Sequence, residues 1–262
     1  MVLERFRVDG RIAIVTGAGR GIGAATALAL AEAGADVALT SRTKEQLDEV
    51  ADQVRSLGRR ALVFPADVNE NEQVEAFVDA AVDEFGGIDI VINNAGGTPP
   101  RPFTATSAGY MERSFHFNVT TAFVCTKAAV PSMLARGGGS VVNMTSAIGR
   151  LRDRGFVAYG TAKAAMSHMT RLMAADLAPK IRVNGIAIGS TATSALETVL
   201  TDDAIRDEMV AKTPLQRLGT PDDIAIGALY LASDAGSWVT GKIIEIDGGL
   251  EEANLALNLP DV

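Results

Sequence analysis

Tyr159 and Lys163 stand four residues apart in an alanine-rich stretch that predicts an α-helix. At that spacing two helical side chains share one face, about one turn apart. A neighbouring ammonium favours the ionised phenol, so we expect the pKa of Tyr159 to lie below its usual value of about 10. Ser146 comes thirteen residues before Tyr159, after a run, 141–145, whose pattern predicts a strand. Together these groups predict proton transfer to or from an alcohol oxygen.

Taken alone, the Tyr–Lys spacing also fits a surface lysine beside a half-buried tyrosine, so it needs a nucleotide site on the same sheet. A glycine-rich segment near the N-terminus has that character. The apolar run 11–16 predicts a buried parallel strand, and 24–33 predicts a helix ended by Gly34. Glycines between them allow a tight turn and bring backbone N–H groups and the helix N-terminus close to a diphosphate. A flexible turn is the alternative. The candidate diphosphate-binding residues are Gly17, Gly19, Arg20, Gly21, Ile22 and Gly23.

Four motifs in register make the chain resemble the short-chain dehydrogenase/reductase family over nearly its whole length. Thr16-Gly17-x-x-x-Gly21-Ile22-Gly23 is similar to the family's cofactor motif, and Asn93-Asn94-Ala95-Gly96 is similar to the motif at the centre of its sheet. The family's catalytic tetrad is matched in order and approximate spacing by Asn118, Ser146, Tyr159 and Lys163. The resemblance implies an oxidoreductase that acts on a CH–OH group with NAD(P).

The resemblance also implies a role for each member of this tetrad. Tyr159 would be the acid/base, and Ser146 would hydrogen bond to the reacting oxygen. Lys163 would bind the nicotinamide ribose and keep the phenolate accessible. Asn118 would hold a water that links Lys163 to solvent, although it could instead only satisfy backbone groups in a long helix.

The order of elements predicts an α/β fold: one domain over 1–262 with a doubly wound parallel (Rossmann) sheet and helices on both faces. The expected strands are 11–16, 35–40, 60–65, 88–92, 139–145, 181–187 and 242–246. The expected helices are 21–33, 43–57, 70–85, 107–135, 157–178 and 221–232, with another segment near 195–211. Ligands in such sheets bind at the carboxyl ends of the strands.

Residues after the second and third strands bear on which dinucleotide binds. An acidic residue near the end of the second strand would accept the ribose hydroxyls and repel a 2′-phosphate, but this chain has Ser41 and Arg42 there. Arg42 and Arg20 could pair with a phosphate, which favours NADP(H) over NAD(H). The alternative is that Arg42 is the solvated start of the next helix and the preference is mixed. By resemblance, Asp67 and Val68 contact the adenine.

The remaining cofactor contacts follow from the resemblance. They are Asn94, Ala95, Gly96, Tyr159 and Lys163 near the sheet centre, and Ile188, Gly189, Thr191 and Thr193 after the sixth strand. Relatives usually carry Pro-Gly at this last site. Isoleucine at 188 loosens the backbone φ angle and restores an N–H, so this contact is the one most open to change.

Substrate signals lie in the segment 195–211, where Leu196, Val199, Leu200, Ile205 and Met209 give an apolar face. It fits either a mobile lid, about 190–215, over an apolar substrate or an ordinary packed helix. The phrases at 93–97 with 100–103, at 164–168 and at 213–219 resemble bacterial 7α-hydroxysteroid dehydrogenases. We therefore expect a bulky, apolar ketone or secondary alcohol.

Two other functions stay open. Arg150, Arg152 and Arg154 could meet a substrate carboxylate or an acyl carrier protein, as in a 3-oxoacyl-[acyl-carrier-protein] reductase, or could simply be solvated. An NADP-sensing binding protein without catalysis is the second alternative, and the complete tetrad argues against it.

Composition bounds the remaining possibilities. The net charge of −8 argues against nucleic-acid binding, and the single cysteine, Cys125, excludes an intrachain disulfide and is expected in a helix core. We expect no signal peptide, no membrane span and a cytoplasmic location. His116 and His168 lack metal-ligand spacing, so no metal site is expected. The resemblance implies a homotetramer or homodimer, for which an exposed edge strand gives a physical reason, and the tail 250–262 is expected to dock on a neighbour or on the active-site rim.

Overall fold

Seven strands form the centre of the molecule in the computed structural model, which describes residues 1–193, 196 and 201–255. They are β1 (Ile12–Thr16), β2 (Asp36–Ser41), β3 (Ala61–Pro65), β4 (Ile90–Asn93), β5 (Gly139–Ser146), β6 (Ile181–Ile188) and β7 (Ile243–Ile246). They pair in one parallel sheet in the order β3-β2-β1-β4-β5-β6-β7. The chain moves outward from β1 to β3 and then returns to β4 on the other side of β1. This reversal opens a crevice at the carboxyl ends of the strands.

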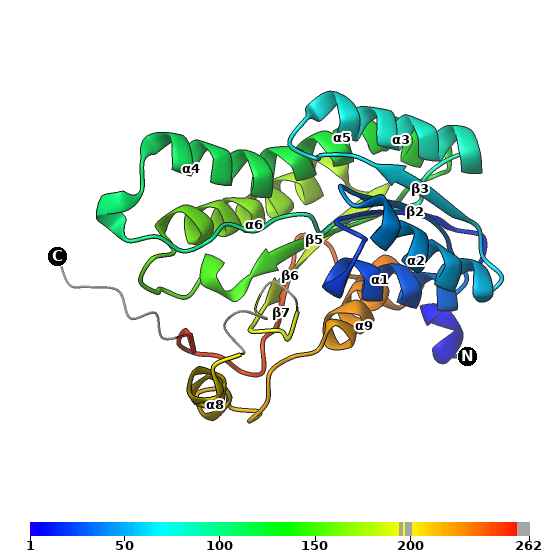
Figure 1. Ribbon diagram of the computed structural model, residues 1–262. Coiled ribbons are helices and arrows are strands. Elements are labelled where there is room, and N and C mark those ends of the chain that lie inside the picture. The colour runs from blue at the N-terminus through cyan, green and yellow to red at the C-terminus, as the bar shows by residue number, and fades with distance from the viewer. Residues whose placement is uncertain (194–195, 197–200, 256–262) are drawn as a thin grey trace.

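Helices cover both faces of this sheet, which confirms the predicted fold class (Figure 1). They are α1 (Gly21–Glu32), α2 (Lys44–Ser56), α3 (Asn71–Phe85), α4 (Ala108–Phe115), α5 (Thr121–Ala135), α6 (Val157–Leu177), α8 (Asp203–Ala211) and α9 (Pro221–Ala232). The buried side chains of α1, α2 and α9 pack on one face, and those of α3 and α5 pack on the other. None of the helices in the described ranges is long and apolar enough to cross a membrane.

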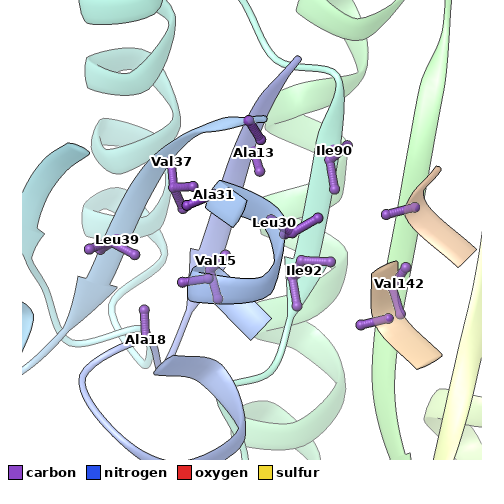
Figure 2. Close-up of a cluster of buried hydrophobic side chains, with 14 of the residues drawn as sticks. Ala13, Val15, Ala18, Leu30, Ala31, Val37, Leu39, Ile90, Ile92 and Val142 are labelled. Carbon is purple, nitrogen blue, oxygen red and sulfur yellow. The ribbon is translucent and has the colours of Figure 1, made fainter. Parts of the chain in front are cut away.

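Strand β1 shows why the sheet needs helices on both sides. All of its residues are buried, and its side chains alternate between two hydrophobic clusters. Ala13 and Val15 pack with Leu30 of α1, as Figure 2 shows, whereas Ile12 and Ile14 face the cluster of α3 and α5. A strand that is apolar at every position is stable only when both faces are covered.

Two helical predictions differ from the structure. The helix expected over 107–135 is interrupted by one π-helical turn, His116–Thr120, which joins α4 to α5 and carries Asn118. Within the described part of the expected segment near 195–211, α8 spans Asp203–Ala211, and Asp202 caps it by accepting hydrogen bonds from the backbone N–H groups of Ala204 and Ile205. Val199 and Leu200 of its predicted apolar face lie outside the described residues, as does 256–262 of the tail.

Candidate functional site

A cavity of about 500 Å³ lies in the crevice at the carboxyl ends of the strands. It brings together residues from both ends of the chain. Of the residues that the sequence predicts for the site, those that line it are Gly17, Gly19, Arg20, Gly21, Ile22, Ser41, Arg42, Asp67, Val68, Asn94, Ala95, Gly96, Ser146, Tyr159, Lys163, Ile188, Gly189, Thr191 and Thr193. Gly23 and Asn118 stand behind this surface.

The glycine-rich turn between β1 and α1 is shaped by close contacts between backbone atoms. Gly17 and Gly21 have φ angles of 64° and 57°, a conformation that glycine adopts without strain. A Cβ atom at Gly23 would lie 2.2 Å from the carbonyl oxygen of Gly17, so only glycine lets α1 begin this close to the turn. The Asn94 amide holds the turn in place, because its Nδ2 donates to the carbonyl groups of Thr16 at 3.0 Å and Gly17 at 3.1 Å.

At the β2 end of the cavity, the side chains offer hydroxyl and guanidinium groups. The Oγ atom of Ser41 is buried and has no hydrogen-bond partner. Arg20 and Arg42 are exposed, and neither forms an ion pair with a carboxylate in the part of the chain that the structure describes. A Cβ atom at Gly19 would lie 2.8 Å from Ser41 Oγ, so the glycine keeps this corner open. An unpartnered buried hydroxyl beside two unpaired cations fits the ribose and phosphate of a nucleotide.

The Asp67 carboxylate lies where the chain leaves β3. Its Oδ1 atom accepts hydrogen bonds from the backbone N–H of Asn69 at 3.0 Å and from Asn69 Nδ2 at 2.9 Å. The turn that these bonds form is also held from α3, because Gln73 Oε1 accepts from the backbone N–H of Asp67 at 2.9 Å. Asp67 and Val68 are thus fixed at the wall of the cavity.

Ser146, Tyr159 and Lys163 come together where β5 ends and α6 passes over it. Ser146 is the last residue of β5, and its Oγ accepts from the backbone N–H of Ile148 at 3.3 Å. Lys163 is 3% exposed, and its Nζ donates to the carbonyl oxygen of Met144 at 2.8 Å. The same Nζ lies 5.7 Å from the centre of the Tyr159 ring. The predicted one-turn separation on a single helix face is therefore present.

The pKa values of this group differ from the sequence prediction. Burial raises the pKa of Tyr159 above its ordinary value, and a hydrogen bond with the Ser146 side chain only partly opposes this effect. The prediction of a lowered pKa is therefore wrong. Burial also lowers the pKa of Lys163 to about 8, which weakens the positive charge that was expected to stabilise the phenolate. Desolvation disfavours the charged form of each group, and here it outweighs their mutual attraction.

Asn118 lies in the π-helical turn and uses its side chain to fasten the loop after β4. Its Oδ1 accepts from the backbone N–H of Gly97 at 2.8 Å, and its Nδ2 donates to the Ser114 carbonyl at 2.8 Å and to Thr98 Oγ1 at 3.1 Å. These contacts support the alternative in which Asn118 satisfies neighbouring backbone groups, and a water held beside Lys163 stays a prediction. A Cβ atom at Gly96 would lie 2.8 Å from Asn118 Oδ1 and 3.1 Å from Lys163 Nζ, so glycine is needed between these two residues.

Ile188 stands where the resemblance leads one to expect proline, and the geometry of the loop after β6 shows what isoleucine allows. Strand β6 extends as far as Ile188, which pairs in register with Ser146 of β5 and Ile246 of β7. Proline cannot donate to such a ladder. Gly189 follows, and a Cβ atom there would lie 2.5 Å from Cα of Asp247. The backbone at Ile188 is therefore held in the sheet up to the point where it lines the cavity.

Several lining residues were not found from the sequence. They are Thr43, Gln46, Ala66, Gly97, Phe117, Met144 and Thr145, whereas Leu196, which the sequence places on the apolar face of segment 195–211, also lines the cavity. A signal existed for some of them: Gln46 lies in the first turn of α2, directly after Arg42 and the end of β2, and Met144 and Thr145 precede Ser146 in β5. Thr43, Ala66, Gly97 and Phe117 each adjoin a predicted site residue in the sequence, namely Arg42, Asp67, Gly96 and Asn118.

Other predicted features fall outside the cavity lining. Arg150 is bound within the chain, since it pairs with Glu245 at 2.9 Å and Asp247 at 2.8 Å. Cys125 is buried in the cluster of α3 and α5, and burial raises the pKa of its thiol to about 12, so the interpretation as a core residue is confirmed. No group of three or more metal-ligating side chains occurs among the residues that the structure describes.

Comparisons with known proteins show which family this chain is similar to. A family model described as Enoyl-(Acyl carrier protein) reductase matches residues 17–251. An uncharacterized oxidoreductase of Mycobacterium tuberculosis is 54% identical over 263 residues, which cover 100% of both chains. A 7alpha-hydroxysteroid dehydrogenase of Escherichia coli K12 is 40% identical over 253 residues, which cover 96% of this chain and 98% of that protein.

Solved structures give the same result. A 7 alpha-hydroxysteroid dehydrogenase complexed with NADH and 7-oxo glycochenodeoxycholic acid matches with a TM-score of 0.92 and 38% identity, covering 96% of this chain and 99% of that chain. A gluconate 5-dehydrogenase from Burkholderia cenocepacia, in complex with NADP and tartrate, matches with a TM-score of 0.89 and 35% identity, covering 95% and 98%.

A doubly wound sheet whose cavity joins a glycine-rich turn to a buried Tyr–Lys pair defines an α/β oxidoreductase of the nucleotide-binding type. The chain belongs to the short-chain dehydrogenase/reductase family. It is an oxidoreductase that acts on a CH–OH group, and the bound NADH and NADP of its structural neighbours support a nicotinamide cofactor.

Proposed function

We propose that this protein is an NADP(H)-dependent oxidoreductase that interconverts a ketone and a secondary alcohol on an apolar, hydroxysteroid-like substrate. The observation that carries the proposal is the single cavity that contains both the glycine-rich turn and Ser146, Tyr159 and Lys163. Binding and chemistry would then occur on one surface, with the reacting carbon between them.

In the proposed mechanism each side chain has one task. Tyr159 donates its phenolic proton to the carbonyl oxygen in reduction, and its raised pKa keeps that proton in place near neutral pH. Ser146 donates a hydrogen bond to the same oxygen, which stabilises the charge that develops there. Lys163, fixed to the Met144 carbonyl, binds the cofactor's ribose from α6. When bound, the nicotinamide supplies the hydride in reduction and accepts it in oxidation.

The preference for NADP(H) rests on the β2 end of the cavity. No carboxylate stands at the end of β2, where Ser41 is the last residue, and two unpaired guanidinium groups, those of Arg20 and Arg42, line the cavity nearby. A 2′-phosphate would gain charge-assisted hydrogen bonds from both, whereas a ribose hydroxyl would find no acidic acceptor there.

The substrate class rests on apolar side chains and on the relatives. Phe117, Met144, Ile188 and Leu196 line the cavity together with Ser146 and Tyr159. The 7alpha-hydroxysteroid dehydrogenases that resemble this chain act on a hydroxysteroid, as their names state. Arg150, one of the three arginines considered for an acyl carrier protein, pairs instead with Glu245 and Asp247 within the chain, which weakens that alternative.

Exposed apolar residues on the long helices support the proposed homotetramer. Phe123 and Leu134 of α5 and Leu172 of α6 are about half exposed, and β7 has only β6 as a neighbour in the described sheet. Covering these surfaces with further copies of the chain would remove apolar area from water. Light scattering of the purified protein measures the assembly directly.

A ketone panel tests the proposed function. The oxidation of NADPH and of NADH is followed with a 7-oxo bile acid, a 3-oxoacyl thioester and a small aliphatic ketone. We expect turnover with the steroid and a lower Kd for NADPH than for NADH. Faster turnover of the thioester would identify the acyl reductase, and tight cofactor binding without turnover of any carbonyl would identify a sensor.

A further inference from the structure

The side-chain amide of Asn254 is buried at the point where the C-terminal segment meets the cavity loop. It is 3% exposed. Its Oδ1 accepts a hydrogen bond of 2.6 Å from the hydroxyl of Ser190. Its Nδ2 donates to Thr213 Oγ1 at 2.9 Å and to the carbonyl of Met209 at 3.2 Å. All of its hydrogen-bonding groups are thus used within one small region.

These partners belong to two different parts of the fold, the cavity loop and the end of α8. Ser190 stands between Gly189 and Thr191, and both of these neighbours line the cavity. Met209 is a buried residue of α8, and Thr213 follows the end of that helix. Asn254 therefore joins the loop that forms one wall of the cavity to the C-terminal end of α8.

The chemistry of the contact requires an amide. The hydroxyl of Thr213 already donates its proton to the Met209 carbonyl at 2.7 Å. Toward residue 254, the Thr213 hydroxyl and the Met209 carbonyl can therefore only accept, so the side chain there must be a donor. The hydroxyl of Ser190 needs an acceptor on the other side. A carboxylate would place an acceptor against the Met209 carbonyl, and an apolar side chain would leave buried polar groups without partners.

The C-terminal segment is also held at its start, so it does not depend on Asn254 alone. Arg150, in the loop after Ser146, donates to the Leu250 carbonyl at 2.7 Å and pairs with Asp247. The backbone N–H of Leu215 donates to the Gly248 carbonyl at 3.1 Å. Segment 247–254 therefore runs from the Ser146 loop to the Ser190 loop and contacts the chain after α8 on the way.

We propose that Asn254 is a positioning residue that couples the cavity loop 188–193 to α8. Backbone hydrogen bonds to Ile246 and Gly219 also hold this loop, and Asn254 adds a buried side-chain contact that ties Ser190 to the end of α8. The effect of Asn254 on dinucleotide affinity rests on the proposed function, but the coupling between the loop and α8 is a property of the protein itself.

Hydrogen exchange tests the coupling without any cofactor. Ser190→Ala removes one hydroxyl on the loop side, and Thr213→Val removes one on the α8 side with little change in volume. We expect the backbone amides of 209–213 to exchange faster in Ser190→Ala, and those of 189–192 to exchange faster in Thr213→Val. The reason is that Asn254 transmits each loss to the other side. Changes confined to the mutated side in both variants would overturn the proposal. Glu251→Gln, at an exposed position of the same segment, is the control.

Cofactor affinity supplies the second readout. The lost bond lies within the protein and raises the Kd only by letting the loop leave its binding arrangement, so we expect a rise of at most about tenfold for NADPH in both Asn254→Ala and Ser190→Ala. The double variant should be no weaker than the weaker single variant, because both changes break the same contact. Multiplicative losses would overturn the proposal. If the wild-type chain binds no dinucleotide, the proposed function fails while the exchange experiment still decides the role of Asn254.

Discussion

The Nζ atom of Lys163 donates to the carbonyl oxygen of Met144, two residues before Ser146 in β5, at a distance of 2.8 Å. This bond fixes α6 to β5 at the place where Ser146 and Tyr159 meet. It also takes the ammonium into the protein interior, which is why its pKa falls to about 8. The arrangement thus positions Ser146 and Tyr159, and the burial that comes with it lowers the pKa of Lys163.

Replacing Tyr159 with Phe should reduce turnover by at least about 100-fold, because the variant has no proton to donate. The ring should keep its place beside Phe156, whose centroid lies 6.2 Å away, so the Kd for NADPH should change little. Steady-state rates and fluorescence titration measure the two effects. Tyr230→Phe, which removes a phenol on α9, is the matched control and should have normal turnover. Near-normal activity in Tyr159→Phe would falsify the acid/base role.

The pKa of Lys163 predicts how stability varies with pH. Below about pH 8 both the folded and the unfolded chain hold this proton, so the group adds no pH dependence. Between about pH 8 and its ordinary value of 10.5, the unfolded chain holds a proton that the folded chain has lost, so the free energy of unfolding should rise with pH. Urea unfolding at several pH values in this window should show the rise in the wild type and a smaller one in Lys163→Met. Identical slopes in the two proteins would contradict the assignment.

Substitution of Arg42 tests the dinucleotide preference. Arg42→Ala should raise the Kd for NADPH by about 10- to 100-fold through loss of a charge-assisted hydrogen bond, and should leave the Kd for NADH unchanged. Arg55→Ala is the control, since that arginine pairs with Asp52 on the exposed side of α2. Equal losses for both dinucleotides would show that Arg42 does not contact the 2′ position.

A methyl group at Gly23 should damage the glycine-rich turn. Its Cβ would lie 2.2 Å from the Gly17 carbonyl oxygen, and such crowding costs about 1–3 kcal/mol of stability. We expect Gly23→Ala to lower the free energy of unfolding by this amount and to abolish dinucleotide binding. Gly109→Ala, within α4, meets only Arg113 Nη1 at 3.4 Å and should be neutral or stabilising by up to about 1 kcal/mol. Wild-type stability in Gly23→Ala would show that the turn tolerates a side chain.

The sequence by itself determined the helices and strands and the order in which the site residues follow them. Apolar runs such as 11–16, the spacing of the glycines and the cap at Thr220 act between neighbours in the chain, so their effects can be read locally. The carboxyl ends of parallel strands meet at one edge of a sheet, and for this reason the sequence places Asn94 and Ser146 at the same edge.

Only the tertiary structure decided the properties that depend on burial and on distant partners. The direction of the Tyr159 pKa shift reverses because packing removes water from both members of the pair, and no local pattern reports how complete that removal is. Asn254 and Ser190 are 64 positions apart, and Asn118 and Gly97 are 21 apart. The two residues of each pair come within hydrogen-bond distance only when the chain folds, so no local sequence pattern reports these contacts.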